Sequence, residues 1–203
     1  MNKTVVLASG NPGKLREFQQ MLQTCGLDVV PQGNFAVPDI EETGLTFVEN
    51  AILKARNACE HTGHPAIADD SGIEVDALNG APGIYSARFS NGWQGENASD
   101  GRNNAYLLER LAGVPDAQRT ARYQCVLVYM RHAADPTPLI CQASWKGRIL
   151  TAPQGENGFG YDPLFWLDEL NCTSAQLPKD EKNRISHRAK AMAMLLAALQ
   201  NTR

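Results

Sequence analysis

The chain has 203 residues, of which 43% are hydrophobic, so it is long enough to bury a sizeable core. Its formal net charge of -3 gives no broad basic surface for a nucleic-acid polymer, so an anionic ligand has to meet a local group of Lys and Arg. The five cysteines form no CxxC pair, and the longest apolar run, AMAMLLAAL, is too short to span a bilayer. We therefore expect a cytoplasmic globular protein without structural zinc, a signal peptide or a membrane segment.

The first predicted elements are a strand, a glycine-containing turn and a helix. A short apolar run from Val5 to Leu7 enters the turn SGNPGK, and apolar residues then recur at helical spacing. The first N–H groups of a helix lack internal partners and attract anions, so the turn is a candidate phosphate site. It is not a P-loop, because its glycines are too close together and Leu15 replaces the metal-binding hydroxyl. A plain turn with a solvated Lys14 fits the same residues.

Residues 46–61, TFVENAILKARNACEH, predict an amphipathic helix. The acidic pair Glu41 and Glu42 precedes this helix, and Lys54 lies within it. Magnesium takes oxygen ligands and keeps several waters, so one Glu and one Asp suffice when phosphate oxygens complete the site. Negative charge before a helix N-terminus is also stabilising without any metal, and this structural alternative remains open.

Two adjacent carboxylates, Asp69 and Asp70, end the apolar strand PAIADDSG. Ligands of open α/β sheets collect outside the carboxyl ends of strands, so a catalytic acid is expected here. Neighbouring strand side chains point to opposite faces, so only one of the two can face a given ligand. The alternative is that both carboxylates brace a turn. The following IEVDAL is a candidate second strand.

The middle of the chain predicts a mixed sheet. Residues 90–104, SNGWQGENASDGRNN, are expected to form a mobile loop, and residues 102–112 a helix. The segments RTARYQCVLVYMRH and TPLICQASWKGRIL, joined by AADP, predict an antiparallel hairpin. Antiparallel strands in a chain of otherwise alternating strands and helices indicate an α/β fold with a mixed central sheet and flanking helices.

Two stretches near the C-terminus carry further ligand-binding candidates. In GENGFGYDPLF, the ring of Phe159 or Tyr161 could stack on a base and Asp162 could accept from a ring N–H, although a plain aromatic turn fits equally. A last helix is predicted to begin at the N-cap Ser186. The stretch KDEKNRISHRAK at its start supplies donors suited to phosphate or a carbonyl oxygen, namely Lys182, His187 and Arg188.

Several motifs of this chain, in their order and spacing, closely resemble those of the inosine/xanthosine triphosphate pyrophosphatase family. They are SGNPGK, EETG followed by ENAILKA, ADDSG, GAPGIYSARFS, and FGYD followed by K-x-x-x-x-HR. The resemblance covers nearly the whole chain. It implies one elongated mixed α/β domain over residues 1–203, with two lobes around an active-site cleft, usually as a homodimer. It also implies Mg²⁺-dependent hydrolysis of dITP, ITP and XTP to the monophosphate and pyrophosphate.

Carried over residue by residue, the resemblance makes Asp70 the general base and a magnesium ligand, with Glu41 as the other ligand. Lys54 becomes a second phosphate contact. The resemblance implies further substrate contacts from Ser9, Gly10, Asn11, Pro12, Gly13 and Lys14 at the phosphates, from Ser71, and from Phe159, Gly160, Tyr161, Asp162, Lys182, His187 and Arg188 at the base. Selectivity over adenine is expected to rest on the 6-oxo group, which accepts hydrogen bonds where the adenine amino group donates them.

Two rival interpretations remain. A Maf-like nucleotide pyrophosphatase shares the general architecture, but its first turn is rich in serine and arginine where this chain has SGNPGK. A non-catalytic nucleotide sensor would gain little from Glu41 and Asp70 beside a polyanion. Release of pyrophosphate from dITP separates an enzyme from a sensor.

Overall fold

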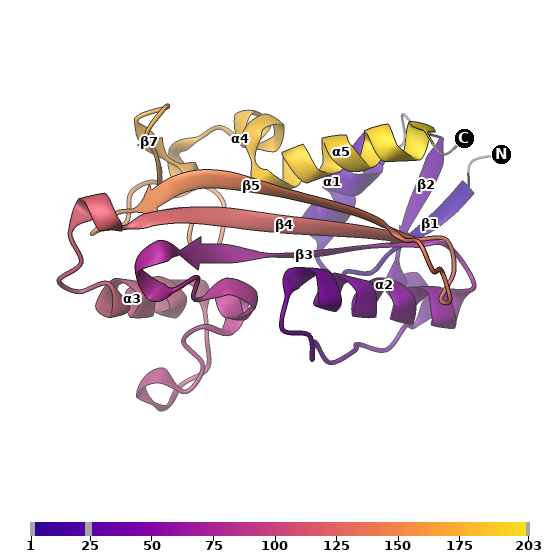
Figure 1. Cartoon of the computed structure of the whole chain (residues 1–203), viewed down its shortest axis with the longest axis horizontal. Helices are drawn as coiled ribbons and strands as arrows, with labels where there is room; N and C mark the ends of the chain where they lie inside the picture. The colour runs from indigo at the N-terminus through magenta and orange to yellow at the C-terminus, as the bar shows by residue number, and fades with distance from the viewer. Residues whose placement is uncertain (1–2, 23–25, 202–203) are drawn as a thin grey trace. The chain divides into compact units, whose positions relative to one another are not determined.

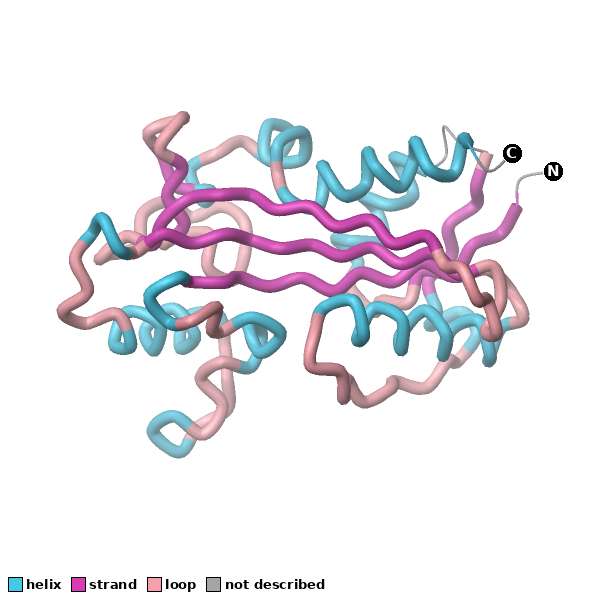
Figure 2. The backbone as a smooth tube through the Cα atoms, viewed as in Figure 1, coloured by secondary structure: helices cyan, strands magenta, loops and turns pink. Residues whose placement is uncertain are grey.

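The computed structural model describes residues 3–22 and 26–201. Within these residues, seven strands form one sheet in the order β2-β1-β3-β4-β5-β6-β7 (Figures 1 and 2). The strands are β1 (Lys3–Leu7), β2 (Leu27–Pro31), β3 (Ala66–Val75), β4 (Thr120–Met130), β5 (Leu139–Ile149), β6 (Phe165–Leu167) and β7 (Cys172–Thr173). The α-helices are α1 (Pro12–Leu22), α2 (Phe47–Thr62), α3 (Asp100–Arg110), α4 (Lys179–Ile185) and α5 (His187–Asn201).

The sheet is mixed, as the sequence predicts. Strand β1 pairs in parallel with β2 and β3, whereas β6 pairs antiparallel with β5 and β7. The predicted hairpin is also found, since β4 and β5 are neighbours in the sheet and residues 131–138 join them. The α/β fold class with a mixed central sheet and flanking helices is therefore confirmed.

The chain divides into two compact units, and the boundaries fall within β3, β4, β5 and α5. The first unit comprises Met1–Asp70, Cys125–Ala143 and Lys190–Arg203. The second comprises Ser71–Gln124 and Ser144–Ala189. Each unit has its own buried apolar cluster.

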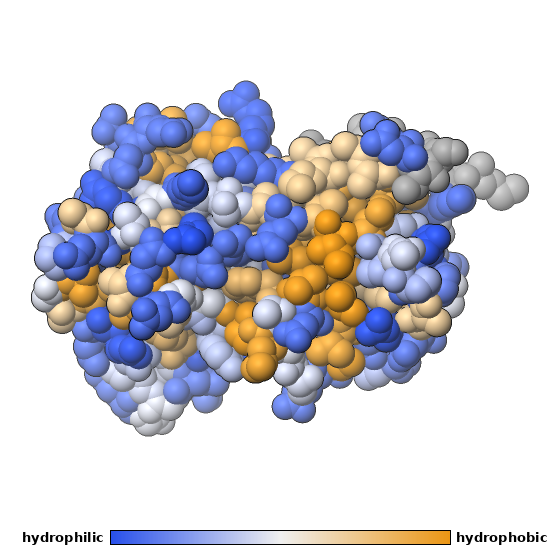
Figure 3. Space-filling view, in the orientation of Figure 1, coloured by the Kyte–Doolittle hydropathy of each residue, from blue (hydrophilic) through white to orange (hydrophobic). Residues whose placement is uncertain are grey.

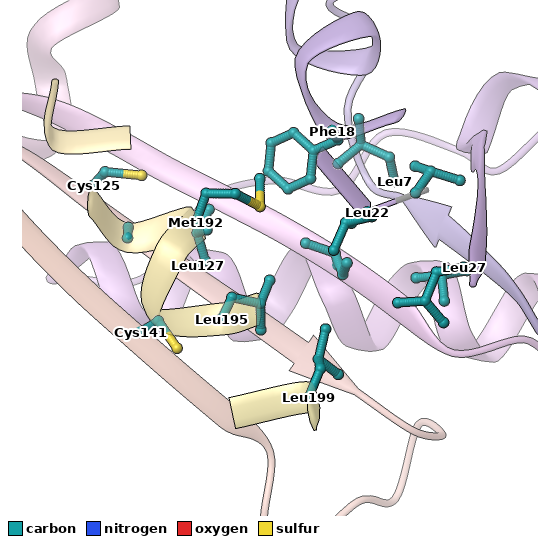
Figure 4. Packing of buried hydrophobic residues seen from close by; sticks show 14 residues of the cluster. Leu7, Phe18, Leu22, Leu27, Cys125, Leu127, Cys141, Met192, Leu195 and Leu199 are labelled. Carbon is teal, nitrogen blue, oxygen red and sulfur yellow. The ribbon is translucent and has the colours of Figure 1, made fainter. Parts of the chain in front are cut away.

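In the first unit, α1 and α5 lie on one face of the strands and α2 lies on the other (Figure 1). Phe18 and Leu22 of α1 pack with Leu127 of β4 and with Met192 and Leu195 of α5 (Figure 4). Burial of each such side chain contributes about 2 kcal/mol. The packing fixes α1, and with it the turn that precedes α1, against the end of β1.

In the second unit, Tyr123 and Trp145 of neighbouring strands pack with Phe165 of β6. Leu107 of α3 joins this cluster. Ser99 starts α3 by accepting a hydrogen bond from the Arg102 N–H at 3.4 Å. This core supports the loop at residues 158–162 that the sequence singles out.

Capping residues define both ends of α2. Thr46 Oγ1 accepts from the Glu49 N–H at 3.3 Å, and the helix ends at Gly63, whose φ of 66° lies in the left-handed region. The two strands suggested around Ser71 are instead one strand, β3. The reason is that β3 runs beside β4 in the sheet, which extends residues that would otherwise favour a turn.

The segment predicted as a mobile loop, residues 90–104, makes aromatic and ion-pair contacts. Its last residues belong to α3, which begins at Asp100. Trp93 packs on Tyr106 with ring centroids 5.3 Å apart. Arg102 forms a salt bridge with Glu96, with Nη1 2.7 Å from Oε2. The helix α4 was not predicted.

Four cysteines, Cys59, Cys125, Cys141 and Cys172, are free thiols, and Cys25 lies outside the described residues. In the part of the chain that the structure describes, no helix is both long and apolar enough to cross a membrane.

Candidate active site

A cavity of about 320 Å³ lies in the first unit, where the chain leaves β1. It is lined by Ser9 and Gly10 of the turn, by Lys14 of α1 and by Lys54 of α2, all of which the sequence predicts as phosphate contacts. The segment between β2 and α2 contributes Gln32, Pro38, Asp39, Ile40 and Glu42, and the remaining lining residues are Ala8, Asn57 and Asp69. The cavity therefore brings together four of the phosphate-contact candidates, from the turn, α1 and α2.

Local hydrogen bonds shape the turn before α1. Ser9 Oγ accepts from the Asn11 N–H at 3.2 Å, and Asn11 Oδ1 accepts from the Lys14 N–H at 3.2 Å. Asn11 thereby caps the helix that Pro12 and Gly13 begin. A Cβ atom at Gly10 would have no neighbour within 4 Å, so open space faces this glycine. A ligand can approach the backbone of the turn closely here.

Two lysines reach the middle of β3 from different helices. Lys14 Nζ lies 2.5 Å from Asp69 Oδ1. Lys54 Nζ donates to Asp70 Oδ1 at 2.8 Å and to Glu42 Oε1 at 3.0 Å. Asp70, the predicted general base, and Lys54, the predicted second phosphate contact, are thus direct hydrogen-bond partners.

Burial and charge tune this group in opposite directions. Burial raises the pKa of Asp70 more than the positive charge of Lys54 lowers it. Burial alone would lower the pKa of Lys54, but the negative charges of Asp70, Asp69 and Glu42 and a hydrogen bond to Asp70 raise it. Lys54 therefore stays charged at neutral pH, while Asp70 is a stronger proton acceptor than an ordinary aspartate.

The donor set suits a hard divalent cation. Carboxylate oxygens of Glu42 and Asp70 converge on one cationic group, the ammonium of Lys54. Two carboxylates with waters and phosphate oxygens match the ligands that magnesium takes. Among the described residues, no group of three or more His, Cys, Asp or Glu side chains could hold a metal by itself. The predicted ligand Glu41 is exposed, and it is the adjacent Glu42 that contacts Lys54.

In the second unit, Asp162 is a buried hydrogen-bond centre rather than an open acceptor. Its Oδ1 accepts from Ser174 Oγ at 2.9 Å and from Tyr123 OH at 3.3 Å. Its Oδ2 accepts from the Phe159 N–H at 2.8 Å and from Lys182 Nζ. The carboxylate thus fixes both the loop and Lys182.

The other predicted base-recognition residues of this unit surround that centre. Phe159 is 58% exposed, and Lys182 Nζ lies 5.2 Å from the centroid of its ring. Tyr161 is buried and donates its hydroxyl to the Ser86 carbonyl oxygen at 2.7 Å. The Gly160 N–H donates to Asp100 Oδ2 at 2.7 Å. Within this loop, the Phe159 ring is the group that remains open to a ligand.

At the start of α5, the His187 ring is buried and stacks on Tyr123 at 4.8 Å. Arg188, the next residue, is partly exposed. Ser71, in β3, is also partly exposed and belongs to the second unit.

A model of the Ham1 family matches residues 5–198. The chain belongs to the Ham1 family. Among curated relatives, the dITP/XTP pyrophosphatase of Vibrio cholerae is 58% identical and aligns with 99% of this chain and 98% of its own length. That of Shewanella oneidensis is 59% identical over 97% of this chain and 93% of its own. The family resemblance read from the motifs is confirmed.

Solved structures of the Ham1 family agree with the fold. A HAM1 protein from Coxiella burnetii is 47% identical, with a TM-score of 0.92 over 98% of this chain and 99% of that one. The Ham1 protein of Staphylococcus aureus is 40% identical, with a TM-score of 0.89 over 99% of this chain and 100% of that one.

Three side chains of this Ham1 protein were not assigned a site role from the sequence. Glu42 contacts Lys54, and its only sequence signal is its place beside Glu41 in an acidic pair. Tyr123 and Ser174 hold Asp162, and both lie in segments that read as an ordinary strand or loop. Their role depends on contacts between distant parts of the chain, which periodicity does not encode.

Proposed function

We propose that this Ham1-family protein is a nucleoside triphosphate pyrophosphatase that hydrolyses dITP, ITP and XTP to the monophosphate and pyrophosphate. The observation that carries the proposal is the direct contact of Asp70 with Lys54, next to a cavity that also holds Lys14 and the turn after β1. The names of the relatives from Vibrio cholerae and Shewanella oneidensis support the substrate class.

In the first unit, we assign the triphosphate to the cavity. The turn Ser9–Lys14 offers backbone N–H groups and the start of α1, both of which favour phosphate. Lys14 and Lys54 supply positive charge. Asp70, with its raised pKa, orients a water and accepts its proton as the water attacks the α-phosphorus.

Magnesium is the proposed cofactor. Asp70 would hold it together with a glutamate, for which the sequence predicts Glu41 and the contact with Lys54 favours Glu42. When bound, the ion supplies positive charge at the phosphate oxygens. Because Lys54 already bridges both carboxylates, it can hold them close together before any ion arrives.

In the second unit, we assign recognition of the base. The exposed Phe159 ring offers a stacking surface, and Lys182 and Asp162 keep that loop in place. Arg188 is a donor only, so it suits the 6-oxo group of hypoxanthine or xanthine and is mismatched to the amino group of adenine. His187, held against Tyr123, completes the proposed group. We propose that both units act as lobes of one pyrophosphatase domain.

We also propose a homodimer in the cytoplasm. In the first unit, apolar surface covers α5 and the strands beside it (Figure 3). Ile140 of β5 and Met194 of α5 are each 48% exposed, as expected of a surface that a second copy covers. The free thiols are the form expected in a reducing compartment. Sedimentation analysis of the wild-type protein and of Met194→Glu tests the dimer.

The decisive experiment is product analysis. The purified protein is incubated with dITP, dATP or dGTP and Mg²⁺ in ¹⁸O-labelled water, and the products are identified by mass spectrometry. We expect pyrophosphate from dITP, with the label in the monophosphate because water attacks the α-phosphorus. Release of inorganic phosphate would contradict the assigned reaction. Tight binding without turnover would favour a sensor, and turnover of other nucleotides but not dITP would favour the Maf-like rival.

A further inference from the structure

The cavity proposed for the triphosphate has more negative than positive side chains. Among the residues that the structure describes, its charged lining consists of two lysines and three carboxylates, namely Lys14, Lys54, Asp39, Glu42 and Asp69. Asp70, which contacts Lys54, adds a further carboxylate beside it. Such a surface repels a free polyphosphate, although the same place has to receive one during turnover.

Asp69 is the most enclosed of these groups. Its side chain is fully buried, whereas 22% of the Lys14 side chain is exposed. A buried carboxylate is costly unless a positive charge accompanies it, so the 2.5 Å contact keeps Lys14 at the cavity wall. The negative charge of Asp69 also offsets the positive charge that Lys14 offers to a phosphate bound at the turn.

We propose that Asp69 is a positioning residue that holds Lys14 in place and, through its own charge, keeps the cavity from binding phosphate groups unless a divalent cation accompanies them. The inference rests on the proposed function, because it takes the cavity as the phosphate site. It gives Asp69 a role separate from the proton transfer assigned to Asp70.

The physical reason is a balance of charge. A pyrophosphate anion meets an excess of carboxylates when it arrives alone, and each like-charge pair weakens its binding. A divalent cation cancels this excess of negative charge, and the Lys14 ammonium can then interact with the phosphate as well as with Asp69. The cavity is thereby reserved for metal-complexed nucleotides, and metal-free nucleotides do not occupy it as unproductive ligands.

The test measures binding of inorganic pyrophosphate by isothermal titration calorimetry, in a chelator and without divalent cations. We expect the wild type to bind weakly and Asp69→Asn to bind at least about tenfold more tightly, because a nearby unit charge acts on several phosphate charges at once. Glu60→Gln is the matched control. Glu60 is exposed on α2, is not among the cavity-lining residues, and its replacement changes the net charge equally. It should give no increase in affinity.

A double variant separates this role from general loosening of the fold. In Asp69→Asn combined with Lys14→Gln, the increase in metal-free affinity should largely disappear, because the released lysine is what the anion binds. An unchanged or weaker metal-free affinity in folded Asp69→Asn would overturn the inference. If Asp69→Asn does not fold, the wild-type protein provides the test. Equal affinity of the wild type for pyrophosphate with and without Mg²⁺ would also overturn the inference.

The outcome is distinguishable from that of the proposed function. Wild-type turnover of dITP without an increase in metal-free affinity in Asp69→Asn rejects this inference and leaves the enzyme assignment intact. The increase in affinity without any turnover of dITP supports the charge role and rejects the assigned reaction.

Discussion

Asp69 and Asp70 are neighbours in β3, yet their carboxylates pair with lysines of different helices. Asp69 Oδ1 lies 2.5 Å from Lys14 Nζ of α1, and Asp70 Oδ1 lies 2.8 Å from Lys54 Nζ of α2. Adjacent strand side chains point to opposite faces, and α1 and α2 lie on opposite faces in the first unit (Figure 1). The strand therefore gives two chemically identical residues different partners, and we expect different effects when each is replaced.

Asp70→Asn should lower kcat for dITP by about a hundredfold or more, because general-base assistance is typically worth that much. Substrate affinity should stay within about an order of magnitude, since the amide keeps the shape of the side chain. Steady-state kinetics with dITP measures both. Asp69→Asn is the matched control and should reduce kcat less. A near-normal kcat in Asp70→Asn would remove this residue from the mechanism.

Glu42→Gln should raise the Mg²⁺ concentration needed for half-maximal turnover by at least about tenfold, because it removes a carboxylate from a site with few protein ligands. Glu41→Gln should have a smaller effect, since Glu41 is exposed and Glu42 makes the contact with Lys54. A Mg²⁺ titration of both variants at saturating dITP provides the comparison. The reverse order of effects would make Glu41 the ligand and leave Glu42 as a partner of Lys54 only.

Arg188→Ala should lower kcat/KM for dITP by at least about tenfold, the scale of a lost charge-assisted hydrogen bond. The loss for dATP should be much smaller, because an arginine makes no favourable contact with the amino group of adenine. The ratio of kcat/KM for the two substrates therefore falls. If both substrates lose the same factor, Arg188 contacts phosphate or supports the fold, and base recognition has to come from elsewhere.

Asp135→Asn should reduce stability near pH 7 by about 2 kcal/mol, because hydrogen bonds to a charged group are lost. Asp135 is buried and accepts from Arg131 Nε at 2.9 Å and from the Thr137 N–H at 3.1 Å. The hydrogen bond from the Arg131 side chain holds the pKa of Asp135 well below its ordinary value.

The pH dependence has a definite sign. A carboxylate with a lowered pKa in the folded state stabilises the protein above its unfolded pKa of about 3.9, and this contribution is lost as the pH falls further. The difference between wild type and Asp135→Asn in urea unfolding should therefore shrink steadily below about pH 4. Asp28→Asn, an exposed change in β2, is the control and should show little difference. A gap that is constant with pH would contradict the assigned role.

Much of the fold follows from local patterns in the sequence. The apolar run before SGNPGK, the helical spacing in TFVENAILKARNACEH and the paired strands around AADP each indicate an element that the structure contains. Helix periodicity and capping are properties of neighbouring residues, so they can be read without knowing the fold. The continuity of β3 was missed, because Asp69, Asp70 and Ser71 favour turns, and it is their place in a strand that neighbours β4 that keeps them extended.

The chemical groups available can be read from the sequence alone: a glycine-containing turn before a helix, lysines, adjacent carboxylates and an aromatic loop. Tertiary structure alone decided which of these groups meet, because side-chain contacts depend on helix faces and strand neighbours far apart in the chain. It directed Glu42 rather than Glu41 to Lys54, and Asp69 to Lys14. It also enclosed Asp162, whose carboxylate reads as an open acceptor in the letters FGYD, within the hydrogen bonds of Tyr123 and Ser174. Burial and direct pairing, which set the pKa of Asp70 and the charge balance of the cavity, exist only once the chain is folded.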